Sequence, residues 1–335
     1  MSLTHLIKDH WHFAAHQADL KHEGDFIKFN LLGEDVVVYN DGQQVIAFDN
    51  VCPHRGARFF DERHGRARAV CKYHGWTISQ GRLIIPQPES YSPCPKRFGQ
   101  YSVEAVGGFL FFAMAPKTSL LEQLGESLYN LLEAISFDAA HLVDVNDYSY
   151  ECHAFVAVEN ALEPDHVPFV HRDTLLNLEL THYRNEFYGK NSIVRFDVGS
   201  QRVRKGLDKF KKYFSLGHHA FDGYMSIHLY PFSFISSTGG YSYSVQSFFP
   251  VSDDETDFVS RLYFPDLTDA RHESVAAVIR ASVTDLNRKV FLEDHAICRR
   301  IRYSAWKSLI DGPLSQDEVK IKRFRENLKL DVREF

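Results

Sequence analysis

Two pairs of cysteine and histidine constrain how the first hundred residues can fold. Cys52 and His54 form the first pair, and Cys71 and His74 form the second after 16 intervening residues. Both pairs lie between strand-like segments, so two loops must meet if the four side chains hold one metal centre. Zinc ribbons usually present Cys-x-x-Cys knuckles, whereas each loop here offers one thiolate and one imidazole. Such mixed pairs favour a two-iron, two-sulfur cluster with both cysteines on one iron and both histidines on the other.

Short segments rich in valine, isoleucine and phenylalanine dominate the first third of the chain. The Asn40-Asp41-Gly42 segment between two of them is a hairpin turn signal. Near Ala115–Thr118 this pattern gives way to a leucine-rich helical stretch, so we expect one domain over residues 1–117 and a second over 118–335. The predicted strands of the first domain cover residues 25–31, 35–39, 45–49, 82–85 and 109–113.

The second domain mixes helical and strand-like patterns. We therefore expect an α+β fold, in which an antiparallel sheet carries helices on one side. The predicted elements are a helix over 119–135, a strand over 148–158, a helical stretch near Glu159 that contains Pro164, strands over 224–236 and 241–251 joined across 238–240, and a long helix over 269–302.

A second pair of histidines lies in the segment from residue 159 to residue 171. His166 and His171 are five residues apart, a spacing that places two side chains on divergent faces of a regular helix. Pro164 and Pro168 interrupt helical geometry, so the two imidazoles can converge from a helix end and the loop after it. Taken alone, however, two such histidines are more often ordinary surface or core residues.

The long C-terminal helix supplies a carboxylate that could complete a metal site. Asp294 occupies a position of the apolar stripe of this helix, where a buried carboxylate must be paired or bound to metal. The alternative is an ion pair with Arg299 or Arg300. Glu293 lies off the stripe, and we expect it to be solvated. The apolar stripe consists of Val275, Ile279, Val283, Leu286, Val290, Ile297 and Ile301.

The two constellations together resemble one known family. The segment CPHRGARFF…CKYHGWTISQGRL resembles the Rieske motif of ring-hydroxylating oxygenases, and ENALEPDHVPFVH with a late Glu-Asp resembles their iron-binding segments. Trp11 also matches their usual N-terminal tryptophan. The resemblance implies an all-β Rieske domain, followed by a helix-grip-like catalytic domain with an antiparallel sheet and a long C-terminal helix.

Position by position, the resemblance also implies a site for each cofactor. A Rieske [2Fe-2S] cluster would be held by Cys52, His54, Cys71 and His74, and a mononuclear Fe(II) by His166, His171 and Asp294. Glu163 would connect the two centres, although most family members have Asp at this position, and Asp165 is the fallback.

The family resemblance implies partners and an assembly as well. It implies a homotrimer in which His74 of one chain faces the connecting carboxylate of the next. The chain contains no G-x-G-x-x-G dinucleotide motif, so we expect a separate ferredoxin or NAD(P)H-dependent reductase to supply electrons for the reaction of O₂ with a small molecule.

Composition excludes several other classes of protein. A net charge of −6 and a pI near 6.3 argue against nucleic-acid binding. The basic run from Arg202 to Lys212 is interpreted as a solvated face, with docking of an acidic redox partner as the alternative.

The sequence contains no apolar run long enough for a membrane helix and no apolar signal core, so we expect a cytoplasmic protein. Five scattered cysteines fit a reducing compartment; Cys94 is interpreted as structural, and Cys152 and Cys298 as core residues.

The substrate is only loosely bounded by the sequence. Aromatic residues are abundant between residues 224 and 251, where alternate side chains could line a pocket or simply fill the core. Such a pocket suits an aromatic or alicyclic substrate, or a methylated or quaternary amine through cation–π contact. Hydroxylation and oxidative demethylation both remain open. The alternative from another class is a Rieske electron carrier fused to a non-catalytic ligand-binding domain. The residues concerned are Met225, His228, Tyr230, Phe232, Phe234, Tyr241, Tyr243, Phe248 and Phe249.

Overall fold

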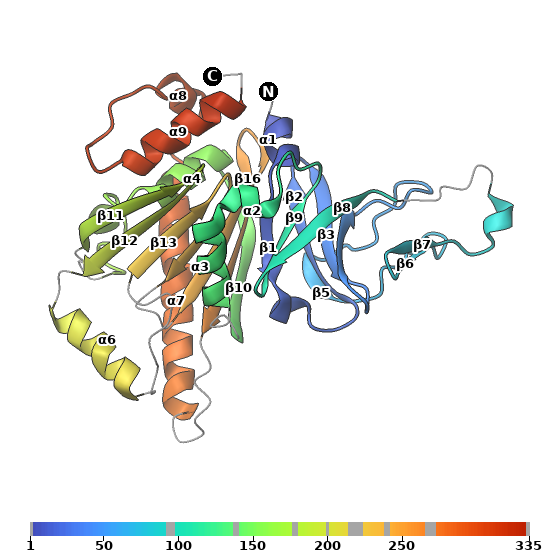
Figure 1. Ribbon diagram of the computed structural model, residues 1–335, viewed down its shortest axis with the longest axis horizontal. Coiled ribbons are helices and arrows are strands. Elements are labelled where there is room, and N and C mark those ends of the chain that lie inside the picture. Colours follow the sequence, from blue (N-terminus) through green and yellow to red (C-terminus); the bar gives the residue numbers. More distant parts are fainter. Residues whose placement is uncertain are drawn as a thin grey trace.

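Two antiparallel sheets form the frame of the molecule (Figure 1). In the computed structural model, the first sheet has the strand order β1-β9-β8-β4-β3-β2-β5 and the second has the order β10-β16-β15-β14-β13-β12-β11. The structure describes residues 3–91, 98–136, 141–175, 180–198, 201–213, 224–237, 242–264 and 273–332.

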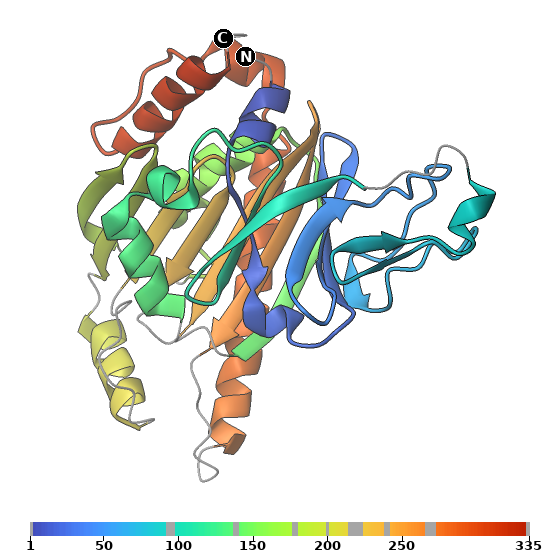
Figure 2. The same cartoon turned by 45° about the vertical axis from the view of Figure 1, so that its right-hand side comes forward.

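The first sheet and a two-stranded extension build the N-terminal part. The extension, β6–β7, projects away from the second sheet in both Figure 1 and Figure 2. The predicted strands are confirmed to within one residue at either end. The strands are β1 (His12–His16), β2 (Asp25–Leu31), β3 (Glu34–Asn40), β4 (Val45–Asp49), β5 (His64–Arg66), β6 (Thr77–Ser79), β7 (Arg82–Ile84), β8 (Gln100–Val106) and β9 (Phe109–Ala113).

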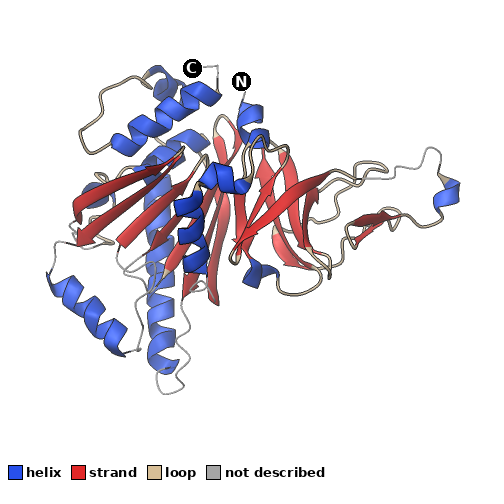
Figure 3. Cartoon of the chain, viewed as in Figure 1, coloured by secondary structure: helices blue, strands red, loops and turns tan. Residues whose placement is uncertain are grey.

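The second sheet carries helices on both faces (Figure 3). The α+β class is confirmed, whereas the expectation of helices on one side only is wrong. The strands are β10 (His141–Tyr150), β11 (Leu180–Tyr188), β12 (Asn191–Val198), β13 (Tyr224–Leu229), β14 (Ser233–Ser237), β15 (Tyr243–Ser252) and β16 (Glu255–Phe264). The helices are α1 (Leu3–Asp9), α2 (Leu120–Leu124), α3 (Glu126–Ser136), α4 (Ala154–Leu162), α5 (Val167–Val170), α6 (Gln201–Tyr213), α7 (Glu273–Cys298), α8 (Tyr303–Ser308) and α9 (Val319–Asp331).

Strand alternation separates the two faces of the second sheet. On β15, Tyr243 and Val245 pack in the core that α2 and α3 complete, whereas Ser244, Gln246 and Phe248 line a cavity on the opposite face. The helices α4, α7 and α9 belong to this opposite face. The sheet therefore forms one wall of the cavity.

Three sequence predictions about element boundaries are wrong for identifiable reasons. The strand predicted over 148–158 ends at Tyr150, because His153 caps a helix whose first five residues are all buried and so show no helical period. The helix predicted over 119–135 is divided at Gly125, which adopts a positive φ of 76°. The strand predicted over 224–236 is two strands separated by a turn that contains Pro231.

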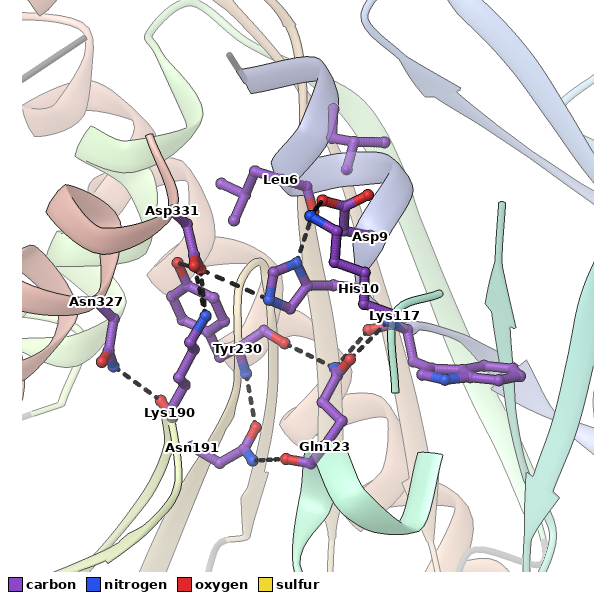
Figure 4. Close-up of polar contacts among 12 residues, drawn as sticks. Leu6, Asp9, His10, Lys117, Gln123, Lys190, Asn191, Tyr230, Asn327 and Asp331 are labelled. Carbon is purple, nitrogen blue, oxygen red and sulfur yellow. Dashed lines mark hydrogen bonds and ion pairs between the residues drawn. The ribbon is translucent and has the colours of Figure 1, made fainter. Parts of the chain in front are cut away.

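A polar network fixes the C-terminal helix α9 to the rest of the molecule (Figure 4). Near the end of α9, Asp331 accepts hydrogen bonds from Lys190 at 2.6 Å and from the hydroxyl of Tyr230 at 2.8 Å. The backbone N–H of Tyr230 donates to Asn191, whose amide donates in turn to the carbonyl oxygen of Gln123 at 2.7 Å. Helix α9 is thus tied to the β11–β12 turn, to the turn after β13 and to α2.

Candidate metal centres

Three side chains from distant parts of the chain converge at one end of α7. His166 Nε2 lies 3.4 Å from Asp294 Oδ1, and His171 Nε2 lies 3.1 Å from the same oxygen. The two imidazole Nε2 atoms are 3.3 Å apart. Ligand atoms bound at about 2.1 Å to one metal ion lie roughly 3 Å from one another. Among the described residues, this trio forms the one group of three or more ligand atoms within 4.8 Å.

The local backbone explains how histidines five residues apart can meet. Helix α4 ends at Leu162, two residues before Pro164. His166 and His171 then flank the short helix α5 as its N-cap and C-cap residues. Because the two histidines bracket a single turn, their rings approach each other instead of lying on opposite sides of a longer helix. The sequence prediction of convergence from a helix end and the following loop matches this arrangement.

Asp294 reaches the histidines from the apolar stripe of α7. Val283, Leu286 and Val290 of that stripe line the same cavity, so this part of the stripe faces an open space. The alternative of an ion pair with Arg299 or Arg300 is wrong. Arg299 Nη1 lies 3.5 Å from Glu151 Oε2, and Arg300 is exposed. Among the described residues, Asp294 instead contacts the two histidines and Asn160.

Carboxylates hold the outward-facing nitrogen of each histidine. Glu163 Oε2 lies 3.1 Å from His166 Nδ1, and Glu293 Oε2 lies 2.8 Å from His171 Nδ1. Donation from Nδ1 leaves each Nε2 free to bind a metal ion, as is usual for metal-bound histidines. The expectation that Glu293 is simply solvated is wrong, since it also accepts a hydrogen bond from Thr174. Asp165, the fallback for Glu163, is exposed and lies 3.4 Å from Ser315.

The electrostatics of the trio favour a bound cation. Burial lowers the pKa of His166, but hydrogen bonds to Asp294 and Glu163 outweigh burial and raise this pKa to about 9. Burial opposes ionisation of Asp294, but the two histidines lower its pKa to about 2. A bound divalent cation would take over the role of the imidazolium protons, so the donor set fits a two-histidine, one-carboxylate metal site.

The Cys52–His54 and Cys71–His74 loops have the same backbone shape. Each cysteine carbonyl accepts a hydrogen bond of 2.9 Å from the N–H of a glycine four residues later, Gly56 or Gly75, and both glycines have a positive φ. The structure brings the two loops together. The His54 and His74 ring centroids are 4.4 Å apart, and both cysteines are buried.

The four side chains of these loops fit a cluster better than a single ion. Nδ1 of His54 and Nδ1 of His74 are both buried and have no hydrogen-bond partner among the described residues. A tetrahedral zinc ion would gather its four ligand atoms within about 4 Å of one another. No three of these four side chains meet even a 4.8 Å limit within the described part of the chain. A two-iron cluster is larger than one ion, so its ligand atoms lie further apart. It would also give the two Nδ1 atoms the partner that they lack among the described residues.

A cavity of about 560 Å³ lies beside the trio. The pocket predicted from the aromatic segment is partly correct: Phe234 and Phe248 line the cavity, whereas Tyr230 and Phe232 pack in the core. Tyr241 lies outside the described residues. Other aromatic lining residues that sequence alternation missed, because they come from other elements, are Tyr150, Phe196 and Phe291.

The remaining sequence predictions concern cysteines, surface charge and membrane segments. Cys152 and Cys298 are buried, as expected, whereas Cys94 lies outside the described residues. The basic run forms α6, and the described side chains of Arg204 and Lys205 are exposed. None of the helices in the described ranges is both long and apolar enough to cross a membrane.

Comparison with known families identifies both halves of the chain. A model of the Rieske [2Fe-2S] domain matches residues 10–94, and a model of the ring-hydroxylating alpha subunit catalytic domain matches residues 144–332, more than half of the chain. The chain belongs to the ring-hydroxylating alpha subunits. The resemblance inferred from the motifs is therefore confirmed, and the two domains imply a [2Fe-2S] cluster and a mononuclear iron. The domain boundary after residue 117 and the individual ligand assignments stay predictions.

Individual relatives of this alpha subunit are distant and match only in part. It is 27% identical over 188 residues to toluate 1,2-dioxygenase subunit alpha from Pseudomonas putida, which covers 51% of this chain and 41% of that protein. It is 33% identical over 135 residues to the carnitine monooxygenase oxygenase subunit from Acinetobacter pittii, which covers 38% of this chain and 36% of that protein. The matched part thus spans well under two thirds of the length of these curated relatives.

Solved structures show the same fold over almost the whole alpha subunit. The quaternary ammonium Rieske monooxygenase CntA in complex with L-carnitine superposes with a TM-score of 0.74 at 20% identity, covering 98% of this chain and 90% of that chain. Naphthalene 1,2-dioxygenase from Rhodococcus sp. bound to indole superposes with a TM-score of 0.65 at 15% identity, covering 99% and 91%.

Proposed function

We propose that this chain is the terminal oxygenase component of a Rieske oxygenase system, and that it hydroxylates or oxidatively demethylates a small organic substrate in the cavity beside His166, His171 and Asp294. The convergence of these three side chains on one point at the wall of the cavity carries this proposal. Iron held by two histidines and one carboxylate retains open positions and would supply the activation of O₂ there.

The protein groups around the site have separate roles in this proposal. Glu163 and Glu293 orient the two histidines by accepting hydrogen bonds from their Nδ1–H groups. Asn160 donates a hydrogen bond of 2.9 Å to Asp294 Oδ1 and so limits rotation of the carboxylate. Aromatic and aliphatic walls exclude water from the substrate and position it beside the iron ligands.

Cys52, His54, Cys71 and His74 would hold the Rieske cluster, which delivers electrons received from a ferredoxin or an NAD(P)H-dependent reductase. In Figure 1 the β6–β7 extension, which follows these loops in the sequence, lies on the far side of the N-terminal sheet from α4 and α7. Transfer within one chain would therefore have to cross the N-terminal domain.

We infer that electrons pass instead between neighbouring chains of a homotrimer. His74 of one chain would approach Glu163 of the next, which also contacts His166. Exposed aromatic side chains beside both centres support such an interface: Tyr73 is 58% exposed next to His74, and Phe169 is 82% exposed between the iron histidines. We place the enzyme in the cytoplasm, since its described cysteines are free, as in a reducing compartment.

The rival proposal, a Rieske electron carrier fused to a non-catalytic binding domain, requires a metal-free second site. The geometry of the trio favours the oxygenase. The aromatic walls of the cavity also suit a quaternary or methylated amine, and several relatives are named for glycine betaine or carnitine.

A screen for substrate-dependent oxygen consumption, with NADH and a surrogate reductase, tests the proposed function. The oxygenase reading predicts that at least one compound among small aromatic acids, alicyclic compounds and methylated amines accelerates oxygen uptake and yields a hydroxylated or demethylated product. A chain with a loaded Rieske cluster but no second iron and no product would support the carrier.

A further inference from the structure

A buried lysine lies at the wall of the active-site cavity. Lys320, in the first turn of α9, lines the cavity and is only 6% exposed. Its side chain makes no hydrogen bond or ion pair with any residue that the structure describes. Among the described residues that line the cavity, Lys320 is the only one that is a lysine or an arginine. Burial of an unpaired amine costs free energy. We therefore look for its partner in a ligand that enters the cavity.

The position of Lys320 is fixed by the helix that carries it. Arg325, five residues further along α9, pairs with Glu159 of α4 through contacts of 2.6 and 2.9 Å. Ile321 and Phe324 pack in the core, and Asp331 joins the polar network of Figure 4. Helix α9 therefore cannot move readily to bring the amine to the surface.

The groups that face Lys320 do not neutralise it. Glu163, at the end of α4, attracts the ammonium, but the two groups form no ion pair, and Glu163 instead engages His166. His228 of β13 faces it from the sheet and, because burial lowers the pKa of His228 to about 3, is neutral. Burial lowers the pKa of Lys320 itself to about 7. A bound anion would restore the charged form.

We propose that Lys320 binds the carboxylate of the substrate, so that the cavity selects small organic acids and lays their aromatic or apolar body along the walls toward His166 and His171. The assignment of the cavity rests on the proposed function, whereas the acid selectivity rests on Lys320. The serines and amides that line the cavity are neutral, so they can donate hydrogen bonds to a carboxylate but cannot select it over the corresponding amide by charge.

Two acid–amide pairs test this selectivity on the holoenzyme. The probes are 4-methylbenzoate with 4-methylbenzamide, and 4-(trimethylammonio)butanoate with its amide, and dissociation constants are measured by calorimetry without reductant. The wild type should bind at least one acid on the order of ten times more tightly than its amide. Lys320→Met should weaken that acid on the order of tenfold to a hundredfold and leave the amide unchanged.

Two further variants control for charge and for helix integrity. Lys322 is exposed on the same helix, so Lys322→Met, which removes the same charge, should not change the affinity for the acid. Lys320→Arg should retain most of the preference for the acid. A preserved preference in Lys320→Met would overturn the proposal, because the acid would then be bound by another group, such as the iron itself. Equal affinity of the wild type for acids and amides, including no measurable binding of either, would also overturn it.

This binding experiment is independent of turnover. A wild type that prefers acids through Lys320 but consumes no oxygen would contradict the proposed function and leave the role of Lys320 standing. An oxygenase that turns over acids and amides equally well would support the proposed function and contradict the role of Lys320.

Discussion

His171 donates a hydrogen bond from Nδ1 to Glu293 Oε2 over 2.8 Å, while its Nε2 faces Asp294, the next residue on α7. The side chains of successive residues on a helix point about 100° apart, so two successive carboxylates can contact one imidazole from different sides. Glu293 fixes the tautomer of the ring, and Asp294 would bind the same metal ion as His171 Nε2. The Glu-Asp pair therefore acts as a unit in the proposed iron site.

Glu293→Gln should weaken the binding of the mononuclear iron by about 10- to 100-fold, because it replaces the charged acceptor that orients His171 with a neutral amide. The Rieske cluster should be unaffected. Iron affinity is measured by competition with a chelator, and the cluster by its absorption spectrum. Asp285→Asn, an exposed carboxylate on the same helix that pairs with Lys289, is the control and should behave as the wild type. Unchanged iron affinity in Glu293→Gln would refute the role of Glu293.

Glu163→Ala should still load both metal centres when iron is supplied in excess, although its iron affinity should fall as in Glu293→Gln, but it should lose oxygen consumption that is coupled to product. The physical reason is that Glu163 is the carboxylate on the outer nitrogen of His166, the point at which a neighbouring cluster would make contact. Iron content, the cluster spectrum and the ratio of product to oxygen consumed are measured together. Asp165→Asn is the matched comparison, since Asp165 is exposed. Normal coupling in Glu163→Ala with loss in Asp165→Asn would transfer the connecting role to Asp165.

The affinity for an acid that Lys320 recognises should fall about tenfold between pH 6 and pH 8, since the free amine has a pKa of about 7. The sign follows from the charged form: lysine is protonated below its pKa and binds the carboxylate, and it loses the proton as pH rises. The carboxylate of the ligand stays ionised throughout this range. Lys320→Arg should bind the acid with little dependence on pH, because arginine does not titrate. An equal pH dependence in both proteins would assign the titration to another group.

Glu159→Ala should lower the free energy of unfolding by roughly 2–4 kcal/mol, because it leaves the guanidinium of Arg325 half-buried and without its partner. Trp306 would also lose the acceptor of its indole N–H, which lies 2.8 Å from Glu159. Chemical denaturation measures the change. Asp285→Ala, which breaks an exposed pair, should cost no more than about 0.5 kcal/mol. Equal effects of the two substitutions would show that the Glu159–Arg325 pair contributes little to holding α9.

The candidate metal ligands could be predicted because their sequence patterns are local and unusual. Cys52 and His54 lie two residues apart, a second cysteine–histidine pair follows with Cys71 and His74 three residues apart, and Asp294 interrupts an apolar stripe. Each of these patterns departs from what is expected of a segment that only builds the core or the surface. The bracketing of α5 by His166 and His171 could be anticipated from the two prolines nearby.

Other features were hidden because they depend on tertiary packing. Glu293 and Lys320 belong to ordinary charged helical sequences, and only the folded chain shows that one meets His171 and the other faces the cavity. The first five residues of helix α4 have the pattern of a strand, because their burial on all sides removes the period that distinguishes the two. Long-range placement of such residues cannot be obtained from periodicity alone.

The most direct test of the two-centre account is the iron content of the wild type beside that of Asp294→Ala. The account predicts about three irons and two acid-labile sulfides per wild-type chain, since a two-iron cluster and one separate iron are present. Asp294→Ala should contain about two irons, with the sulfide content and the cluster spectrum unchanged. A fully loaded wild type with about two irons, or an Asp294→Ala variant that keeps three, would contradict the account.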